Sequence, residues 1–373
     1  MKKLGIGTMR LPLLNKNEPG KVDLEQFKQM VDLYIDNDFT YFDTAYVYHA
    51  GLSENAVKVG LVDRYPRESF QVATKLPAAE IKSFEDRDRI FNNQLNNLGV
   101  SYIDYYLIHC ILKSNYQSVF EKYDCFNWLF DLKEKGLIKK AGFSYHDTAD
   151  LLDKILTKYP QFDFVQLQIN YLDWESNDIQ SRLCYEVAVK HNIDVIVMEP
   201  IKGGALANVD EEVEQLFKSY NSDMSIASWA VRFAASLDKV VTVLSGMSNL
   251  EQAKDNISYM NDFVPLTQKE IELCHHVADI INSKRAIQCT ACAYCVKGCP
   301  MEIQIPDFFE TYNRRMQAVS AGTLMRNKNA YLEMIEKGNG PATCIECGQC
   351  EKSCPQHLTI RQYLKEIVEE YGK

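Results

Sequence analysis

The sequence has no long hydrophobic run. None of its apolar stretches reaches the roughly 20 residues that a helix needs to cross a membrane, so we expect no membrane partner. The apolar run after Lys2 and Lys3 is interrupted by Arg10 and is not followed by a small-residue cleavage site, which argues against a signal peptide. The 373-residue chain also lacks a basic excess. Its net charge of −10 argues against nucleic acid as a partner.

Three cofactor motifs are missing as well. No G-x-G-x-x-G follows the first predicted strand, where an open doubly wound sheet usually carries it. The C-x3-C-x2-C pattern of radical-generating enzymes is absent, and we find no separate flavin motif. The composition is otherwise ordinary for a soluble globular protein, with 46% hydrophobic and 25% charged residues. The length predicts about two domains.

The sequence does have two cysteine quartets near its C-terminus. Each reads C-x2-C-x2-C-x3-C-P, the run that holds [4Fe–4S] clusters in two-cluster bacterial ferredoxins. A loop with two residues between cysteines can wrap three corners of a cubane, and the fourth cysteine reaches the other cluster. We therefore expect one cluster on Cys289, Cys292, Cys295 and Cys354. The other is expected on Cys344, Cys347, Cys350 and Cys299.

Zinc and disulfides are the alternatives for these cysteines. Zinc sites usually pair two C-x2-C motifs across one long gap, without a third cysteine three positions on. A disulfide scaffold requires an oxidising compartment, and nothing in the sequence indicates secretion. Four other cysteines lie in apolar or helical contexts and are expected to pack in the core: Cys110, Cys125, Cys184 and Cys274. We expect a reducing compartment, most simply the cytoplasm.

Strand-like and helical segments alternate eight times in the first 260 or so residues. The expected strands are 4–8, 39–44, 69–74, 103–108, 138–143, 164–169, 194–198 and 240–244. This number and rhythm predict an α/β fold of the (β/α)8 TIM-barrel type, with an open doubly wound sheet as the alternative. Helices are expected between the strands, among them 119–135 and 178–191, and a further helix over 267–283.

The two cysteine quartets are far apart for a compact ferredoxin. The 44 residues between Cys299 and Cys344 contain helical patterns at 306–319 and 328–337, and Tyr363 to Tyr371 reads as a closing helix. We therefore expect a small α-helical ferredoxin-like domain. The predicted domains are a barrel over residues 1–283 and a two-cluster [4Fe–4S] domain over residues 284–373.

Four polar residues lie at the ends of predicted barrel strands. Asp43 and Tyr48 follow the second strand, Lys75 the third and His109 the fourth. Active sites of TIM barrels lie at the carboxyl ends of the strands. A nearby ammonium favours the phenolate form of a tyrosine, an aspartate keeps that lysine charged, and a histidine can orient a substrate oxygen. The set predicts a proton relay beside a carbonyl group.

With these motifs, D-T-A-Y-V-Y, A-T-K and L-I-H, residues 1–260 resemble an aldo-keto reductase. The whole chain resembles the subgroup of that family with a C-terminal two-cluster ferredoxin domain. The resemblance implies that Tyr48 is the general acid/base, that Lys75 tunes it, that Asp43 holds Lys75, and that His109 positions the carbonyl. It also implies NADPH or NADH as a cofactor, in addition to the two [4Fe–4S] clusters.

The resemblance further implies a nucleotide site at several strand ends. Its motifs are G-F-S at Gly142–Ser144, M-E-P-I-K-G-G at Met198–Gly204 and L-S-G-M-S before Gln252, with Asn170 as a further match. The candidate contacts are Gly7, Thr8, Met9, Ser144, Gln168, Met198, Pro200, Ile201, Lys202, Gly203, Ser245, Gly246, Met247, Ser248, Gln252 and Asn256. Gly246 and Ser248 come just before a predicted helix, whose free amides favour a phosphate.

This sequence departs from the pattern of the family at two places. Tyr145 stands where many relatives have asparagine. The phosphate segment lacks the arginine that often contacts the NADPH 2′-phosphate, and Lys254 or Lys202 would have to replace it. The choice between NADPH and NADH therefore stays open.

Three functions follow from the combination of barrel and clusters. The first is an NAD(P)H-linked oxidoreductase acting on a small carbonyl/alcohol pair, with an attached iron–sulfur electron-transfer module. The second is an oxidoreductase that exchanges electrons with a ferredoxin or other carrier and holds a flavin or a one-electron substrate in the barrel, because nicotinamide gives two electrons and a cluster takes one. The third is a non-catalytic redox-sensing interaction protein. An intact set of four polar residues favours an enzyme.

Overall fold

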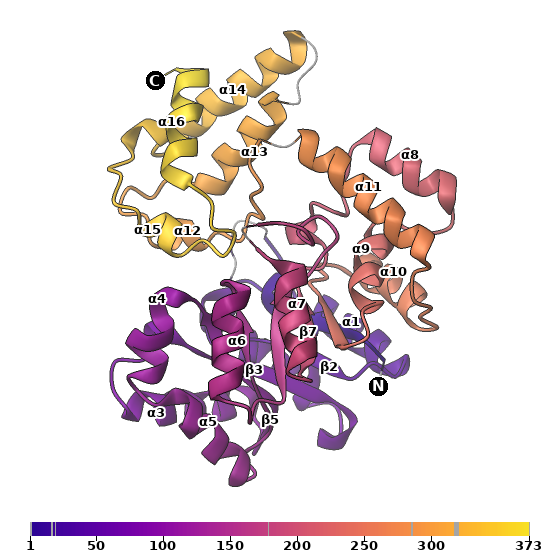
Figure 1. The fold of residues 1–373 in the computed structure, drawn as a ribbon, viewed down its shortest axis with the longest axis vertical. Helices are drawn as coiled ribbons and strands as arrows, with labels where there is room; N and C mark the ends of the chain where they lie inside the picture. The colour runs from indigo at the N-terminus through magenta and orange to yellow at the C-terminus, as the bar shows by residue number, and fades with distance from the viewer. Residues whose placement is uncertain are drawn as a thin grey trace. The chain divides into compact units, whose positions relative to one another are not determined.

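The computed structural model describes residues 2–15, 18, 20–177, 179–284, 286–316 and 321–372. These residues form two compact units (Figure 1). The first unit consists of the described residues of 1–201 and 217–274, and the second of those of 202–216 and 275–373. The second unit thus takes in two segments, 202–216 and 275–283, that precede residue 284 in the sequence.

The first unit is a closed barrel of eight parallel strands, each paired with its neighbours in chain order. The strands are β1 (Leu4–Gly7), β2 (Tyr41–Asp43), β3 (Gln71–Pro77), β4 (Ile103–Ile111), β5 (Ile138–Tyr145), β6 (Phe164–Gln168), β7 (Asp194–Met198) and β8 (Val240–Ser245). The barrel closes because β1 also pairs with β8, where Leu4 lies opposite Val243. The TIM-barrel prediction is confirmed, and the open sheet is excluded.

Helices surround the strands of the barrel (Figure 1). They are α1 (Leu24–Asp36), α2 (Ser53–Val57), α3 (Glu85–Leu98), α4 (Lys113–Asn115), α5 (Cys125–Glu134), α6 (Ala149–Lys158), α7 (Ser181–Lys190), α9 (Ile226–Ala235) and α10 (Leu250–Met260). The helices α8 (Glu211–Tyr220) and α11 (Gln268–Lys284) each contain residues of both units. Among the described residues, no helix is both long and apolar enough to cross a membrane.

Two of these helices begin later than the sequence pattern suggests. The helix expected over 119–135 begins at Cys125, and a separate π-type turn covers Tyr116–Glu121. The helix expected over 178–191 begins at Ser181, and residue 178 lies outside the described residues. Asp124 and Gln180, which precede the two helices, have φ values of 50° and 55°. This left-handed backbone is incompatible with the α-helix, so neither helix can extend further towards its N-terminus.

The barrel has one hydrophobic core inside the strands and another between strands and helices. The inner cluster comprises Tyr41, Ala73, Leu107, Phe164, Ile196 and Leu244. Strands of a parallel barrel are buried on both faces, which explains why most residues of these strands are buried, for example every residue of β2 and β6. The helices contribute amphipathic faces to the outer core. In α1 that face is Phe27, Met30, Val31 and Tyr34, all fully buried.

The second unit is built from helices around the two cysteine quartets. Its helices are α12 (Tyr294–Lys297), α13 (Ile305–Met316), α14 (Ala321–Lys337), α15 (Gln349–Lys352) and α16 (Ile360–Tyr371). Its core includes Ile303, Phe308, Phe309, Leu364 and Ile367. The helix expected over 306–319 is α13, and residues 317–319 of that range lie outside the described residues. The small α-helical domain predicted from the sequence is confirmed.

An internal repeat relates the two halves of this unit. The shift is 55 residues in numbering, the distance from Cys289 to Cys344. It superposes the bounds of α12 on those of α15, and those of α13 on those of α16. It also maps three left-handed residues of the first cysteine loop onto three of the second: Ala291, Ala293 and Glu302 onto Glu346, Gly348 and His357. The two cysteine loops therefore have left-handed residues at equivalent positions.

We predict that Gly142→Ala destabilises the barrel. A Cβ atom on Gly142 in β5 would lie 2.5 Å from ring carbons of Phe164 on the neighbouring strand. Overpacking of this kind costs about 1–3 kcal/mol, and urea unfolding followed by circular dichroism measures it. Gly338→Ala is the control, because no atom lies within 4 Å of its added Cβ. Equal unfolding midpoints for the two variants would contradict the prediction.

Candidate active site and cysteine pockets

A buried ion pair lies where strands β2 and β3 approach their carboxyl ends. The Lys75 ammonium donates to Asp43 Oδ1 at 2.5 Å and to the Thr44 carbonyl at 2.7 Å. The second oxygen of Asp43 accepts a hydrogen bond from Gln166 Nε2 at 3.1 Å. Lys75 is 1% exposed and Asp43 is 3% exposed. A buried charge pair requires such satisfied geometry, because desolvation of both groups is costly.

Tyr48 and His109 lie next to this ion pair. Tyr48 begins a short 3-10 turn after β2 and is half-buried, while His109 lies on β4 and is buried. The Lys75 ammonium is 5.0 Å from the centre of the Tyr48 ring. The rings of Tyr48 and His109 meet edge to face, with centroids 6.0 Å apart. All four polar residues singled out in the sequence are thus brought together at one place.

Burial sets the electrostatics of this group. It lowers the pKa of the Lys75 ammonium, with Asp43 as the main opposing influence. Burial also lowers the pKa of His109 well below its ordinary value, and the positive charge of Lys75 and the nearby His146 act in the same direction. His109 is therefore a neutral imidazole at neutral pH. A neutral imidazole can donate one hydrogen bond to a substrate oxygen without carrying a charge.

A second buried carboxylate supports the lysine strand and was missed by sequence reasoning. Glu54 on α2 is fully buried and accepts from Thr74 Oγ1 at 2.6 Å, Gln94 Nε2 at 2.9 Å and Asn97 Nδ2 at 3.0 Å. The same Gln94 amide donates to the Lys75 carbonyl at 3.0 Å. This network ties α2 and α3 to β3 at the position of Lys75.

One sequence signal indicated this network. On α3, Ile90, Gln94 and Leu98 recur every four residues and therefore share one face of the helix. Ile90 and Leu98 pack in the barrel core, so a glutamine between them had to be buried too. A buried amide needs hydrogen-bond partners, which here include Glu54 and Thr74.

Many of the candidate nucleotide contacts lie at or after the carboxyl ends of β1, β5, β6, β7 and β8. Thr8 is buried after β1, with its hydroxyl 2.9 Å from the Asp43 carbonyl. Ser144 Oγ accepts from the Cys110 amide at 2.7 Å. Gln168 and Asn170 both donate to Asp173 Oδ2, at 2.8 and 2.9 Å. Sequence reasoning missed Asp173, which is a buried carboxylate.

The last group of candidates forms the start of α10. Gln252 Oε1 accepts from the Ser248 amide at 2.7 Å, and Asn256 Nδ2 donates to the Gln252 carbonyl at 2.7 Å. Ser245 is buried, and its hydroxyl lies 3.3 Å from Asn256 Oδ1. These polar side chains therefore hold the segment between β8 and α10 in place. Gly7 is the last residue of β1, and Gly246 directly follows the last residue of β8.

Two other candidates group with the second unit. Lys202 and Gly203 belong to the segment 202–216, and the Lys202 ammonium is 3.3 Å from Gln356 Oε1 within that unit. In the first unit, β7 ends at Met198, and Pro200 and Ile201 follow it. Tyr145, which replaces the asparagine of many relatives, is buried, and its hydroxyl donates to the Thr148 carbonyl at 2.6 Å.

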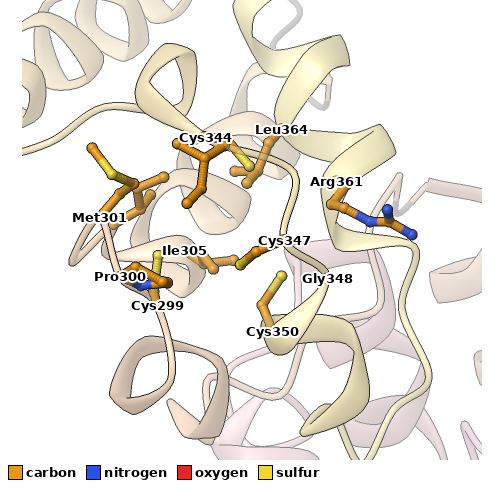
Figure 2. Close-up of a pocket in the computed structure, with 12 residues that line it drawn as sticks. Cys299, Pro300, Met301, Ile305, Cys344, Cys347, Gly348, Cys350, Arg361 and Leu364 are labelled. Carbon is orange, nitrogen blue, oxygen red and sulfur yellow. The ribbon is translucent and has the colours of Figure 1, made fainter.

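The eight cysteines of the two quartets line two separate pockets. One pocket is lined by Cys344, Cys347, Cys350 and Cys299, together with apolar side chains that include Ile305 and Leu364 (Figure 2). The other is lined by Cys289, Cys292, Cys295 and Cys354, together with Phe309 and Leu358. Each pocket thus takes three cysteines from one quartet and the last cysteine from the other. The short helices α12 and α15 pack against each other.

The chemistry of these pockets fits an iron–sulfur cluster. Burial raises the pKa of Cys292 and of Cys350, each to about 11, so both remain protonated thiols until a metal displaces the proton. In the described part of the chain, no three histidine, cysteine or acidic side chains come close enough to share one metal ion. Four thiols around an apolar space suit a group larger than a single ion.

Comparison with known proteins decides the family. The model of the aldo/keto reductase family matches residues 3–279, and the model of a 4Fe-4S dicluster domain matches residues 288–359. The chain belongs to the aldo-keto reductase family. It is therefore an oxidoreductase, and it carries a 4Fe-4S domain. An aldo-keto reductase of Mycolicibacterium vanbaalenii is 27% identical over 241 residues, which are 64% of this chain and 79% of that protein.

Solved aldo-keto reductases share the fold of this chain. One from Bacillus halodurans, in its holo form, is 22% identical with a TM-score of 0.59, covering 74% of this chain and 91% of that one. One from Klebsiella pneumoniae, in complex with NADP and acetate, is 17% identical with a TM-score of 0.59, and the match again covers 74% of this chain and 91% of that one. At these identities the likeness shows the barrel fold of the aldo-keto reductase part alone.

We predict that His109 makes the stability of this aldo-keto reductase depend on pH. Because its pKa is lowered in the folded state, the stability that it contributes is fully present above the unfolded pKa and is lost as the pH falls. Between about pH 7.5 and pH 5.5 the loss from one such histidine is about 1.4 kcal/mol. Urea unfolding at both pH values should show this loss in the wild type and a smaller one in His109→Gln.

The matched control is His276→Gln, which changes an exposed histidine on α11. Its loss of stability on acidification should equal that of the wild type. The same loss in His109→Gln as in the wild type would show that His109 is not kept neutral by the fold.

Proposed function

We propose that this aldo-keto reductase is an NAD(P)H-linked oxidoreductase acting on a small carbonyl/alcohol pair, with Tyr48 as general acid/base. The observation that carries the proposal is the buried Lys75–Asp43 ion pair beside the Tyr48 ring. A bound nicotinamide would supply or accept the hydride. A solved aldo-keto reductase from Klebsiella pneumoniae is in complex with NADP. In this chain Gly7 ends β1 and Gly246 directly follows β8, at the strand ends where a nucleotide would bind.

The chain's own residues would handle the proton and the substrate oxygen. In reduction, the Tyr48 hydroxyl gives its proton to the carbonyl oxygen as a hydride reaches the carbon, so the carbonyl becomes an alcohol and Tyr48 becomes a phenolate. The Lys75 ammonium stabilises that phenolate, because opposite charge favours the ionised form. The neutral His109 donates a hydrogen bond to the same substrate oxygen and orients it. Asp43 keeps the ammonium charged and in place.

We propose that residues 284–373 hold two [4Fe–4S] clusters and act as an electron-transfer module. One cluster is assigned to Cys289, Cys292, Cys295 and Cys354, and the other to Cys344, Cys347, Cys350 and Cys299. The support is that the same two sets of cysteines line the two pockets. Bound clusters would exchange single electrons. A ferredoxin or other one-electron carrier is the partner that this chemistry suits.

The second candidate function is ferredoxin-coupled electron transfer with a flavin or a one-electron substrate in the barrel. The presence of two cysteine pockets favours it, since one cluster would be enough to hold the small unit together. The experiment that separates the two functions is anaerobic. The protein with its iron is mixed with NADPH or NADH, and the cluster absorbance and EPR signal are followed with and without a carbonyl substrate.

Two outcomes of that experiment decide between the candidates. Nucleotide oxidation that requires a carbonyl and leaves the clusters oxidised supports the carbonyl reductase. Bleaching of the clusters without a carbonyl supports the electron-transfer enzyme, since electrons then pass from nucleotide to cluster. Absence of both reactions would exclude both functions.

We predict that Tyr48→Phe abolishes carbonyl reduction while the clusters stay assembled. Loss of a general acid lowers the rate by about 10²- to 10⁴-fold, and the steady-state rate with NADPH or NADH measures it. Iron content and the visible spectrum should equal those of the wild type. Tyr46→Phe, two residues earlier in the chain, is the control and should retain its rate. Undiminished turnover of Tyr48→Phe would refute the acid role.

We predict that Cys347→Ser damages one of the two clusters. The wild type should contain about eight iron and eight sulfide per chain, and the variant about four to five of each, because one cubane loses a ligand. Chemical iron and sulfide analysis measures both. The control is Cys184→Ala, a buried cysteine on α7 far along the chain from either quartet. Retention of about eight iron in Cys347→Ser would show that the ligand assignment is wrong.

A further inference from the structure

Arg10 lies against the segment that joins β8 to α10. It ends the short 3-10 turn after β1, and its side chain is half-buried. A Cβ atom on Gly246 would be 3.3 Å from Cβ and Cδ of Arg10 and 3.4 Å from Cγ. The carbonyl of Arg10 accepts a hydrogen bond from Ser248 Oγ at 3.1 Å. The aliphatic part of Arg10 therefore lies against Gly246, and the hydrogen bond from Ser248 fixes the Arg10 backbone.

The charged end of Arg10 has no partner within the described ranges of the chain. Its guanidinium makes no hydrogen bond or ion pair there, unlike that of Arg64, which pairs with Asp32 at 2.6 Å. A guanidinium offers five donors in a planar fork that matches a phosphate, and it stays charged at any working pH. A preformed, half-buried arginine of this kind is suited to an anionic ligand.

The other side chains of this segment do not supply a positive charge. Gln252 and Asn256 are used to hold the start of α10, and Met247 is buried. Lys254 is exposed on the surface of α10. Of the basic residues near Gly246 in the fold, Arg10 is the one that the structure holds against the glycine.

We propose that Arg10 binds a phosphate group of the nicotinamide nucleotide, and so takes the place of the arginine that the segment before α10 lacks. The inference rests on the proposed nucleotide-linked function. Two sources of that phosphate exist: the 2′-phosphate, which NADPH alone carries, and the pyrophosphate, which NADPH and NADH share. The two sources predict different effects on the two nucleotides.

The test is equilibrium binding to the full-length protein with its iron. Isothermal titration calorimetry measures the dissociation constants of NADPH, NADH, 2′,5′-ADP and ADP for the wild type and Arg10→Met. Loss of a charged hydrogen bond should weaken binding by about ten- to a hundredfold. Arg10→Lys keeps the positive charge but not the planar set of guanidinium donors, so it should lose less affinity than Arg10→Met. Higher salt should weaken wild-type binding more than that of Arg10→Met.

Arg64→Met is the matched control, because it removes an arginine of the same unit whose partner is Asp32. It should bind all four probes as the wild type does. Circular dichroism and iron content should show that every variant is folded and loaded.

Each outcome of the binding experiment decides the inference. A loss confined to NADPH and 2′,5′-ADP supports contact with the 2′-phosphate and makes Arg10 a determinant of NADPH preference. An equal loss for NADPH and NADH supports contact with the pyrophosphate. If the nucleotides bind tightly to the wild type and equally tightly to Arg10→Met, the inference about Arg10 is overturned but the proposed function is not. Absence of binding to the wild type overturns the proposed function as well.

Discussion

A lysine ammonium and an aspartate carboxylate are buried together where β2 and β3 approach their carboxyl ends. Removing both charges from water is costly, and hydrogen bonds within the pair and around it offset that cost. The ammonium donates to Asp43 and to the Thr44 carbonyl, and the carboxylate also accepts from Gln166. Glu54 and Gln94 hold the strand that carries Lys75. The barrel thus holds the Lys75 ammonium in a fixed, buried position 5.0 Å from the centre of the Tyr48 ring.

The second unit depends on a different constraint, which is the sharing of cysteines between its two halves. The two loops have left-handed residues at equivalent positions, and the last cysteine of each quartet lines the pocket of the other. Each pocket is therefore lined by cysteines from both halves. Under the proposed assignment, each cluster would need both loops in place, and this would couple metal binding to folding of the whole unit.

The limits of sequence reasoning are clearest at Glu54, Asp173 and Arg10. The strand-end residues Asp43, Lys75 and His109 were found from the sequence because parallel strands end on the same face of a barrel, so position along the chain indicates position in space. Glu54, Asp173 and Arg10 were not found, because their importance comes from partners on other elements. In the case of Arg10 the partner is Gly246, more than half the chain away.

The sequence by itself determined the barrel and the number of its strands, because apolar runs of strand length separated by amphipathic helices have few other ways to bury their surfaces. It also determined which residues have ligand chemistry, since the spacing of a cysteine quartet is a local property. Only the tertiary structure decided which side chains share a hydrogen-bond network and where helices begin. Hydrogen bonds depend on contacts between particular side chains, and a left-handed backbone depends on the φ angle of a single residue. A periodic sequence pattern predicts neither of these.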